Sequence, residues 1–345
     1  MKIFSKIYLG LLTLAMLLWA MPWAINFALS RPGRSPFVMY SPLIRDFILY
    51  SHDETNGLKR HDTQGNTYTE AQADSLLPTF YVRQLVTDGR WPDTLLGRQV
   101  TPHEVQRTNF SFRSNAADVN AIGVGLYMLQ EAMSGRVEME LPTDVLRFTP
   151  NGLEFIDMAS NTVDTEKSQR FTETLKAKGF AFPPRHIASN PSTRKDYDNG
   201  MLLLDAQNQL FHLKQLRGRP YARHVELPEG LEPRQLFVTE FRDRQLLGLL
   251  CDAENTLWAL RANDYTLHRT GITRFDPQRD NISIVGNMFD WTVRISTPQT
   301  ERWLAIDATS LQLIDTLTIS PNRGFHMPGL CFGSPTSPHL RPRWR

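Results

Sequence analysis

An uncharged apolar stretch near the N-terminus constrains this chain more than any other feature. Residues 7–29 (IYLGLLTLAMLLWAMPWAINFAL) hold no charge over 23 positions, and about 20 apolar residues suffice to cross the hydrocarbon core of a bilayer. A cleavable signal peptide has an apolar region of only about 7 to 15 residues. The stretch therefore predicts an uncleaved transmembrane anchor preceded by a cytoplasmic head at 1–6. A signal cleaved near Ala28 and Ser30 is the alternative.

The charges that flank the stretch do not orient it by themselves. Lys2 and Lys6 precede it, whereas Arg31 and Arg34 follow it, so the positive-inside rule gives no clear answer. A short basic head before a signal-like run, followed by a long domain, favours export of that domain. We therefore expect a single-pass inner-membrane protein whose bulk faces the periplasm.

Composition indicates a folded domain without affinity for nucleic acid. Hydrophobic residues make up 41% and charged residues 21% of the chain, and the formal net charge is only +2. Disordered chains are less hydrophobic, and nucleic-acid binders carry a basic surface. The two cysteines are too few for a disulfide scaffold. Cys251 follows an apolar run and is predicted to be a buried free thiol, with a bridge to Cys331 as the alternative.

Residues 36–150 have mixed α and β character. The runs 37–40 and 47–51 read as strands. Two segments match the capping box, in which a Ser or Thr precedes Glu or Gln by three residues and starts a helix. These are Thr69 with Gln72, and Thr101 with Glu104.

Residues 151–321 contain a weak repeat in which an apolar strand ends in Asp, turns through small polar residues and resumes as a second apolar strand. The four Asp residues are Asp157, Asp205, Asp252 and Asp307. Their spacings of 48, 47 and 55 residues are close to the 40 to 50 of propeller blades. We predict a mainly β fold of propeller-like antiparallel blades with short helical insertions, and a plain antiparallel sandwich is the alternative.

A helix interrupts this repeat region, and a tail follows it. A helix is predicted between Asp164, as its N-cap, and Lys178, because apolar residues recur four apart and Gly179 follows as a terminator. The tail 322–345 is rich in proline, has no strand pattern and is predicted to be disordered.

Signatures of catalysis and of cofactor binding are missing from the sequence. It has no phosphate-binding loop, no dinucleotide glycine fingerprint and no Gly-x-Ser-x-Gly elbow, and no second His follows His103 at zinc-ligand spacing. We therefore predict no cofactor, no metal and no catalytic residue. The densest charged cluster, in a loop, is the best candidate for ligand binding, and a solvated turn is its alternative. The cluster comprises Arg194, Lys195, Asp196 and Asp198.

Short segments spread along the chain resemble an uncharacterised domain-of-unknown-function family of single-pass envelope proteins from Bacteroidota. They include Leu77-Pro78, Arg83-Gln84-Leu85, Asp88-Gly89-Arg90, Phe182-Pro183, Thr193-Arg194-Lys195 and Phe211-His212-Leu213-Lys214. The resemblance covers residues 1–320 and fails after Pro321. It implies an envelope location, with an ABC-type transporter as one expected partner, but it implies no activity.

The resemblance also implies a modification. In that lineage, Asp-Ser/Thr-apolar tripeptides on exported proteins are associated with O-glycosylation. Three such tripeptides occur here, which makes Ser75, Thr94 and Thr316 candidate glycan acceptors, with chance occurrence in turns as the alternative.

Together these features predict a membrane-anchored extracytoplasmic binding or accessory module without enzymatic activity. Its expected partners are the membrane, through residues 7–29, and an envelope protein such as a transporter. The alternative is an anchored glycan- or peptide-acting hydrolase, because propellers can bring acidic residues together only by folding.

Overall fold

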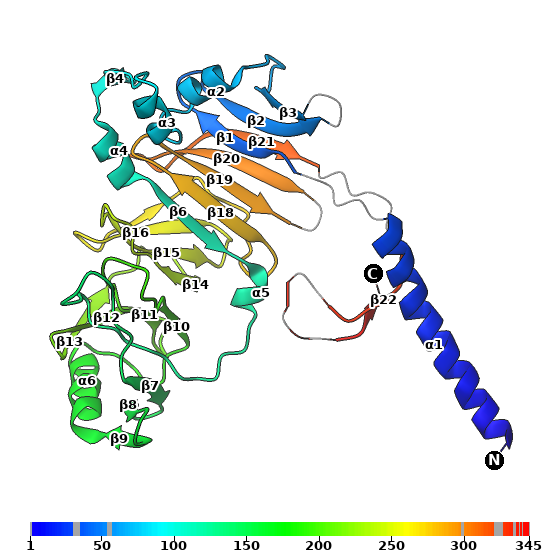
Figure 1. Ribbon diagram of the computed structural model, residues 1–345. Helices are drawn as coiled ribbons and strands as arrows, with labels where there is room; N and C mark the ends of the chain where they lie inside the picture. The colour runs from blue at the N-terminus through cyan, green and yellow to red at the C-terminus, as the bar shows by residue number, and fades with distance from the viewer. Residues whose placement is uncertain are drawn as a thin grey trace.

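The computed structural model describes residues 2–29, 35–53, 57–297, 300–320, 327–333, 336, 337, 339 and 341–344. The linker arginines Arg31 and Arg34, on which orientation depends, lie outside the described residues. Helix α1 (Lys2–Leu29) extends away from a β-rich body (Figure 1). Its segment Ile3–Leu29 is long and apolar enough to cross a membrane, and a signal sequence would have the same length and composition.

Among the described residues, five antiparallel sheets have three or more strands, and we number them I to V by their order in the chain. Each is built from neighbouring strands joined by short turns, and only sheet V takes one strand, β6, from far away in the chain. Sheet I comprises β1 (Phe37–Ser41), β2 (Asp46–Asp53) and β3 (Gly57–His61); sheet II β7 (Asp144–Thr149), β8 (Gly152–Asp157) and β9 (Thr162–Asp164); sheet III β10 (His186–Ser189), β11 (Met201–Leu204), β12 (Leu210–Leu216) and β13 (Arg219–Val225); sheet IV β14 (Pro233–Val238), β15 (Leu246–Asp252), β16 (Leu257–Arg261) and β17 (Leu267–Arg269); sheet V β6 (Phe110–Ser114), β18 (Asn281–Gly286), β19 (Asp290–Ser296), β20 (Glu301–Asp307) and β21 (Leu313–Ile319).

The sheets stack face to face in the order I–V–IV–III–II (Figure 1). Strand β11 shows why the sequence folds this way. Met201 and Leu203 pack toward sheet II, whereas Leu202 and Leu204 pack toward sheet IV, because successive side chains of a strand face opposite sides. A strand buried on both faces is apolar throughout, which explains the runs of consecutive Leu.

This arrangement confirms the predicted fold class: mainly β, with repeated propeller-like antiparallel blades and short helical insertions. As in a propeller, the first and last sheets of the chain, I and V, are neighbours, with Val38 and Phe47 packed on Trp303. Sheets I and II lie at opposite ends of the row in Figure 1. The boundary predicted at residue 150 falls inside the β7–β8 hairpin, where Thr149 pairs with Gly152.

All four repeat Asp residues lie at hairpin corners, and a fifth, Asp62, does the same after sheet I. In sheet III, Asp205 Oδ1 accepts the backbone N–H groups of Gln207 and Gln209, both at 2.8 Å. Asp62 and Asp252 bind the N–H groups two and four residues later in the same way. These bonds hold a tight turn whose next-to-last residue has positive φ, as at Asn208 (φ 66°). The repeated Asp therefore stabilises the hairpin turns, and this structural role accounts for the repeat.

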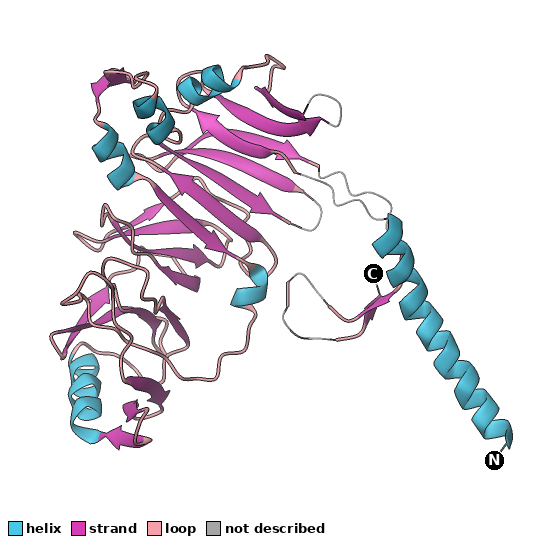
Figure 2. Cartoon of the chain, viewed as in Figure 1, coloured by secondary structure: helices cyan, strands magenta, loops and turns pink. Residues whose placement is uncertain are grey.

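The remaining helices lie at the periphery of the strands (Figure 2). Both predicted capping boxes are present, at the start of α2 and of α4, and Asp164 caps α6 as predicted. The helices are α2 (Glu70–Leu76), α3 (Val82–Thr87), α4 (Pro102–Thr108), α5 (Ala116–Val119) and α6 (Thr165–Ala177), and a small hairpin joins β4 (Thr94–Leu95) to β5 (Arg98–Gln99). Cys251 is a buried free thiol, as predicted, and Cys331 is also free.

The described part of the tail, predicted to be disordered, contains a two-stranded sheet of β22 (Leu330–Cys331) and β23 (Arg343–Trp344). This sheet lies against α1. The Asn26 side chain exchanges two hydrogen bonds with the backbone of Met327, at 2.9 and 2.6 Å. Gly329 approaches Pro22 so closely that a Cβ would meet the Pro22 ring at 2.4 Å.

Candidate functional site

The charged cluster predicted from the sequence is divided by the fold. Lys195 and Asp198 lie at the junction of sheets III and IV, where their side chains are only 6% and 4% exposed. The Lys195 ammonium donates to Asp198 Oδ1 at 2.5 Å, to Glu240 Oε1 at 2.7 Å and to the Asn190 carbonyl at 2.6 Å. All three ammonium hydrogens are therefore used.

The two carboxylates of this junction are equally well partnered. Asp198 Oδ2 accepts the backbone N–H of Gly200, and Glu240 Oε2 accepts the Asn190 amide. Burial raises the pKa of Asp198 to about 6 despite the nearby Lys195 ammonium. With every charged atom bonded inside the protein, these residues join the two sheets, and a role for them in ligand binding stays a prediction.

The other two predicted residues face solvent. Arg194 is exposed, and Asp196 is 63% exposed beside Arg242, with 3.7 Å between the charged atoms. The fold thus separates an inner pair, Lys195 and Asp198, from an outer pair. A role for the outer pair in binding stays a prediction.

The candidate glycan acceptors are all exposed. Thr94 lies in β4 and Thr316 in the edge strand β21, while the Ser75 hydroxyl in α2 donates to the Ala71 carbonyl and accepts from Arg90. Glycosylation stays a prediction, and the intact mass of the native protein tests it.

A larger candidate site opens at the edge of the interface between sheets IV and V. This cavity, which we call the IV/V cavity, has a volume of about 410 Å³. Three rings form one wall: Phe110 stacks on Phe241, with 4.2 Å between centroids, and meets Trp291 edge-on at 5.4 Å. Gly286 makes this packing possible, because a Cβ there would meet the Phe110 ring at 2.3 Å.

Charged groups converge on the same cavity. Burial raises the pKa of Asp243, although the Gln245 N–H, which donates to Oδ1 at 3.2 Å, and nearby arginines offset part of the effect. Arg98 and Arg261 also line the cavity, and neither forms a side-chain hydrogen bond or ion pair within the described part of the chain. Arg98 is exposed, and Arg261 is close enough to Asp243 to lower the pKa of that carboxyl. A guanidinium without a hydrogen bond beside an aromatic wall suits an anionic or aromatic group.

Sequence reasoning missed the IV/V cavity for a physical reason. Its lining comes from residues between 98 and 311, and no two of the charged members are close in the sequence. The one local signal was Gly286, a glycine at the end of the apolar strand β18, which marks a close approach. Among the described residues, no group of three His, Cys, Asp or Glu side chains is arranged to hold a metal.

Comparison with known proteins places the chain in context. A family model described as a domain of unknown function (DUF4857) matches residues 37–306. No curated protein matches. Among solved structures, the Dos1 propeller is 12% identical with a TM-score of 0.31, over 84% of this chain and 62% of that one.

Two other solved structures show the same level of similarity. Hydrazine synthase of Kuenenia stuttgartiensis is 11% identical with a TM-score of 0.29, over 59% of this chain and 50% of that one. PorZ of Porphyromonas gingivalis is described as a surface component of the type-IX secretion system. It is 10% identical with a TM-score of 0.26, over 86% of this chain and 34% of PorZ. The chain thus spans at most 62% of these three proteins, and such low TM-scores transfer no function.

Proposed function

Because the chain belongs to this family of unknown function, we propose its role from its own geometry: a membrane-anchored binding module of the cell envelope. In this proposal α1 stays uncleaved, the body faces the periplasm, and the IV/V cavity recognises an acidic or aromatic group of a partner. An ABC-type transporter or another envelope complex is the proposed partner.

The observation that carries the proposal is a preformed aromatic wall beside two arginines, Arg98 and Arg261, that form no side-chain hydrogen bond or ion pair within the described part of the chain. Aromatic and Arg side chains contribute most of the binding energy at protein interfaces, when they are held rigidly. Here Gly286 and the ring contacts fix the wall before any ligand arrives. Pre-organisation lowers the entropic cost of binding.

The same cavity gives less support to hydrolysis of glycans. Most glycoside hydrolases place two carboxylates about 5 to 10 Å apart across the reacting bond. Asp243 is the single acidic side chain among the residues that line the IV/V cavity. We therefore favour binding over the hydrolase alternative.

Crosslinking in intact cells of the native host, followed by purification of the full chain from solubilised membranes, tests the proposal. Arg261→Glu should reduce recovery of a specific partner by tenfold or more, because it places a like charge opposite the partner's acidic group. Arg269→Glu is the matched control, since Arg269 lies in the same sheet but is 58% exposed and outside the cavity. Equal recovery with both variants would refute the assigned site.

Orientation needs its own experiment. Alkaline phosphatase fused to the C-terminus should be active, because that enzyme matures only outside the cytoplasm. The matched fusion to a cytoplasm-dependent fluorescent protein should be dark. The opposite pattern would place the body in the cytoplasm and remove the envelope partner from the proposal.

A further inference from the structure

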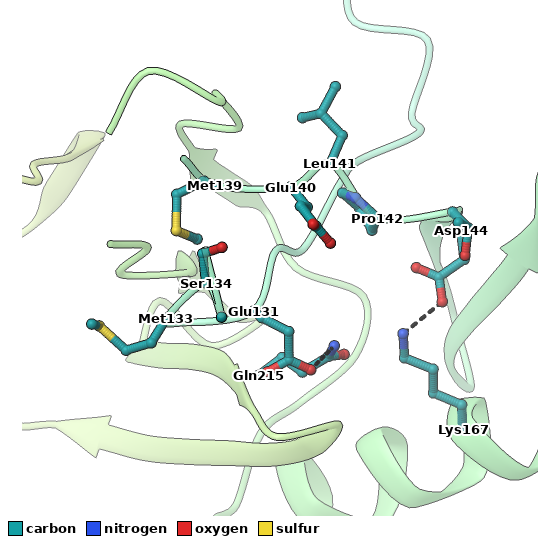
Figure 3. Close-up of a pocket in the computed structure, with 12 residues that line it drawn as sticks. Glu131, Met133, Ser134, Met139, Glu140, Leu141, Pro142, Asp144, Lys167 and Gln215 are labelled. Atoms are coloured by element: carbon teal, nitrogen blue, oxygen red, sulfur yellow. Dashed lines mark hydrogen bonds and ion pairs between the residues drawn. The ribbon is translucent and has the colours of Figure 1, made fainter. Parts of the chain in front are cut away.

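A second cavity, of about 240 Å³, lies between sheets II and III, far along the row from the IV/V cavity. We call it the II/III cavity. Its walls come from the connection 131–144, from Lys167 on α6 and from Gln215 on β12 (Figure 3). Glu131 and Asp144 contribute carboxylates to its lining, and the third lining carboxylate, Glu140, is 71% exposed.

Gln215 presents a buried oxygen without a partner. Its side-chain Nε2 donates to Glu131 Oε1 at 2.6 Å, and this contact fixes the amide orientation, because a carboxylate cannot bond to an amide oxygen. The opposite atom, Gln215 Oε1, is buried and has no hydrogen-bond partner. Gln215 is only 8% exposed. A buried acceptor left unbonded is costly unless something outside the chain donates to it.

Asp144 repeats this arrangement on the other side of the cavity. Its Oδ2 pairs with the Lys167 ammonium at 2.5 Å, and that ammonium also lies 4.1 Å from the centroid of the Phe155 ring. The second oxygen, Asp144 Oδ1, is buried and has no partner. The two unpartnered atoms, Gln215 Oε1 and Asp144 Oδ1, are therefore both acceptors, and a hydrogen-bond donor would satisfy them.

The charge balance identifies the donor as a cation. Glu140 is 71% exposed and pairs with Arg136 at 3.4 Å, and Asp144 pairs with Lys167, the one basic residue among those lining the cavity. Within the described part of the chain, the charge of Glu131 therefore has no cation beside it. Glu131 Oε1 already accepts from Gln215 and from the Gly218 N–H at 2.7 Å. A neutral hydroxyl could donate to the acceptors but would leave the excess negative charge. An ammonium donates to the acceptors and also neutralises the charge.

The rim of the cavity is apolar. Met133 and Leu141 line it, although they are 56% and 49% exposed, and Met139 is buried beside them. Methionines adapt to the shape of a flexible apolar stem. The complete environment is an acidic interior behind an apolar rim.

From this environment we propose that the II/III cavity binds a primary ammonium carried on a short alkyl stem, supplied by a lysine side chain of a partner polypeptide. The ammonium donates to Gln215 Oε1 and Asp144 Oδ1, and the stem passes Met133 and Leu141. The site is separate from the IV/V cavity, so its failure would leave the proposed function untouched.

Titration of the full chain in detergent with n-butylammonium chloride, followed by calorimetry, tests the proposal at constant ionic strength. We expect saturable binding, with n-butanol at least tenfold weaker because it lacks the charge. Glu131→Gln should weaken n-butylammonium binding about tenfold. Glu138→Gln, on the same exposed connection but outside the lining, should leave it unchanged.

The source of the ammonium is distinguished by two further probes. A blocked Gly-Lys-Gly peptide should bind at least as tightly as n-butylammonium, whereas spermidine binding more tightly than the peptide would overturn the assignment to a polypeptide. Equal binding of n-butanol, or equal losses in Glu131→Gln and Glu138→Gln, would overturn the ammonium site itself. Matching melting temperatures of the two variants show that each is folded.

Discussion

Two buried charged clusters, one at the junction of sheets III and IV and one at the cavity between sheets II and III, differ in how completely they are bonded. At the III/IV junction, Lys195 donates to three acceptors, and the carboxylates of Asp198 and Glu240 have all their contacts inside the protein. At the II/III cavity, Gln215 and Asp144 each keep one buried oxygen without a partner. Buried charge alone therefore does not identify a functional site.

The difference follows from what each cluster does for the fold. A fully bonded cluster holds two sheets in one position, and it loses stability when any member is removed. A cluster with unbonded acceptors lacks part of that stabilisation. Replacing one of its members should therefore lower the free energy of unfolding less, and should mainly affect ligand binding. Mutations at the III/IV junction should therefore lower stability strongly, whereas mutations at the II/III cavity should lower stability little and ligand binding strongly.

The largest effect should come from Lys195→Met. It leaves Asp198 and Glu240 buried side by side without their cation, which should lower the free energy of unfolding by about 3 to 5 kcal/mol. Chemical denaturation of the full chain in detergent, followed by tryptophan fluorescence, measures this loss.

A control separates charge from shape in that experiment. The triple replacement Lys195→Met, Asp198→Leu, Glu240→Leu removes every charge of the cluster, and it should recover part of the stability. A loss below about 1 kcal/mol in Lys195→Met would mean that the cluster is not a structural junction, and the contrast between the two clusters would fail.

The pH dependence of the same junction is the next largest effect. Burial raises the pKa of Asp198 to about 6 from its ordinary 3.8. A folded-state pKa above the unfolded value means that the folded protein binds the proton more tightly. The contribution of Asp198 to stability is therefore greatest below about pH 4 and is lost as the pH rises to about 6.

Asp198→Asn removes this titration and tests the sign. The stability difference between wild type and Asp198→Asn should shift in favour of the variant as the pH rises from 4 to 6.5, because the other carboxyl groups titrate in both proteins and cancel. Denaturation midpoints at four pH values in this range provide the measurement. A difference that stays constant would contradict the assignment to Asp198.

The sequence predicted the parts of this molecule that depend on local chemistry. Hairpin corners at Asp205 and Asp252 and the helix caps at Thr69 and Thr101 follow from side chains that bond their own neighbouring backbone. Strands buried on both faces, such as β11, follow from their apolar runs.

What the sequence could not predict depends on partners that are distant in the chain. Lys195 and Asp198 looked like a surface cluster because Glu240, which completes it, lies 45 residues away. The acceptors of the II/III cavity are equally dispersed, since Gln215 meets Glu131 across 84 residues. Whether a charged residue is bonded or unbonded is decided by such pairs, and no local pattern reports it.

Gln215→Leu should have a smaller effect than either change at the junction. It removes one hydrogen bond to Glu131 and one unpartnered oxygen together, so the loss should be about 0.5 to 1.5 kcal/mol. Chemical denaturation in the same detergent measures it, while n-butylammonium binding should fall about tenfold. A loss as large as that of Lys195→Met would show that the II/III cavity is a structural junction as well.

The smallest effect should come from Asp196→Ala, two positions before Asp198 and on the outside of the same loop. Its carboxylate is 63% exposed and 3.7 Å from the Arg242 guanidinium, and such solvent-exposed pairs contribute little because water and salt screen them. We expect a change in unfolding free energy within about 0.5 kcal/mol, measured as above. If Asp196→Ala folds normally but no longer recovers the partner, the binding surface lies on this loop. A large loss of stability would instead show that the exposed pair Arg194 and Asp196 supports the fold as the buried pair does.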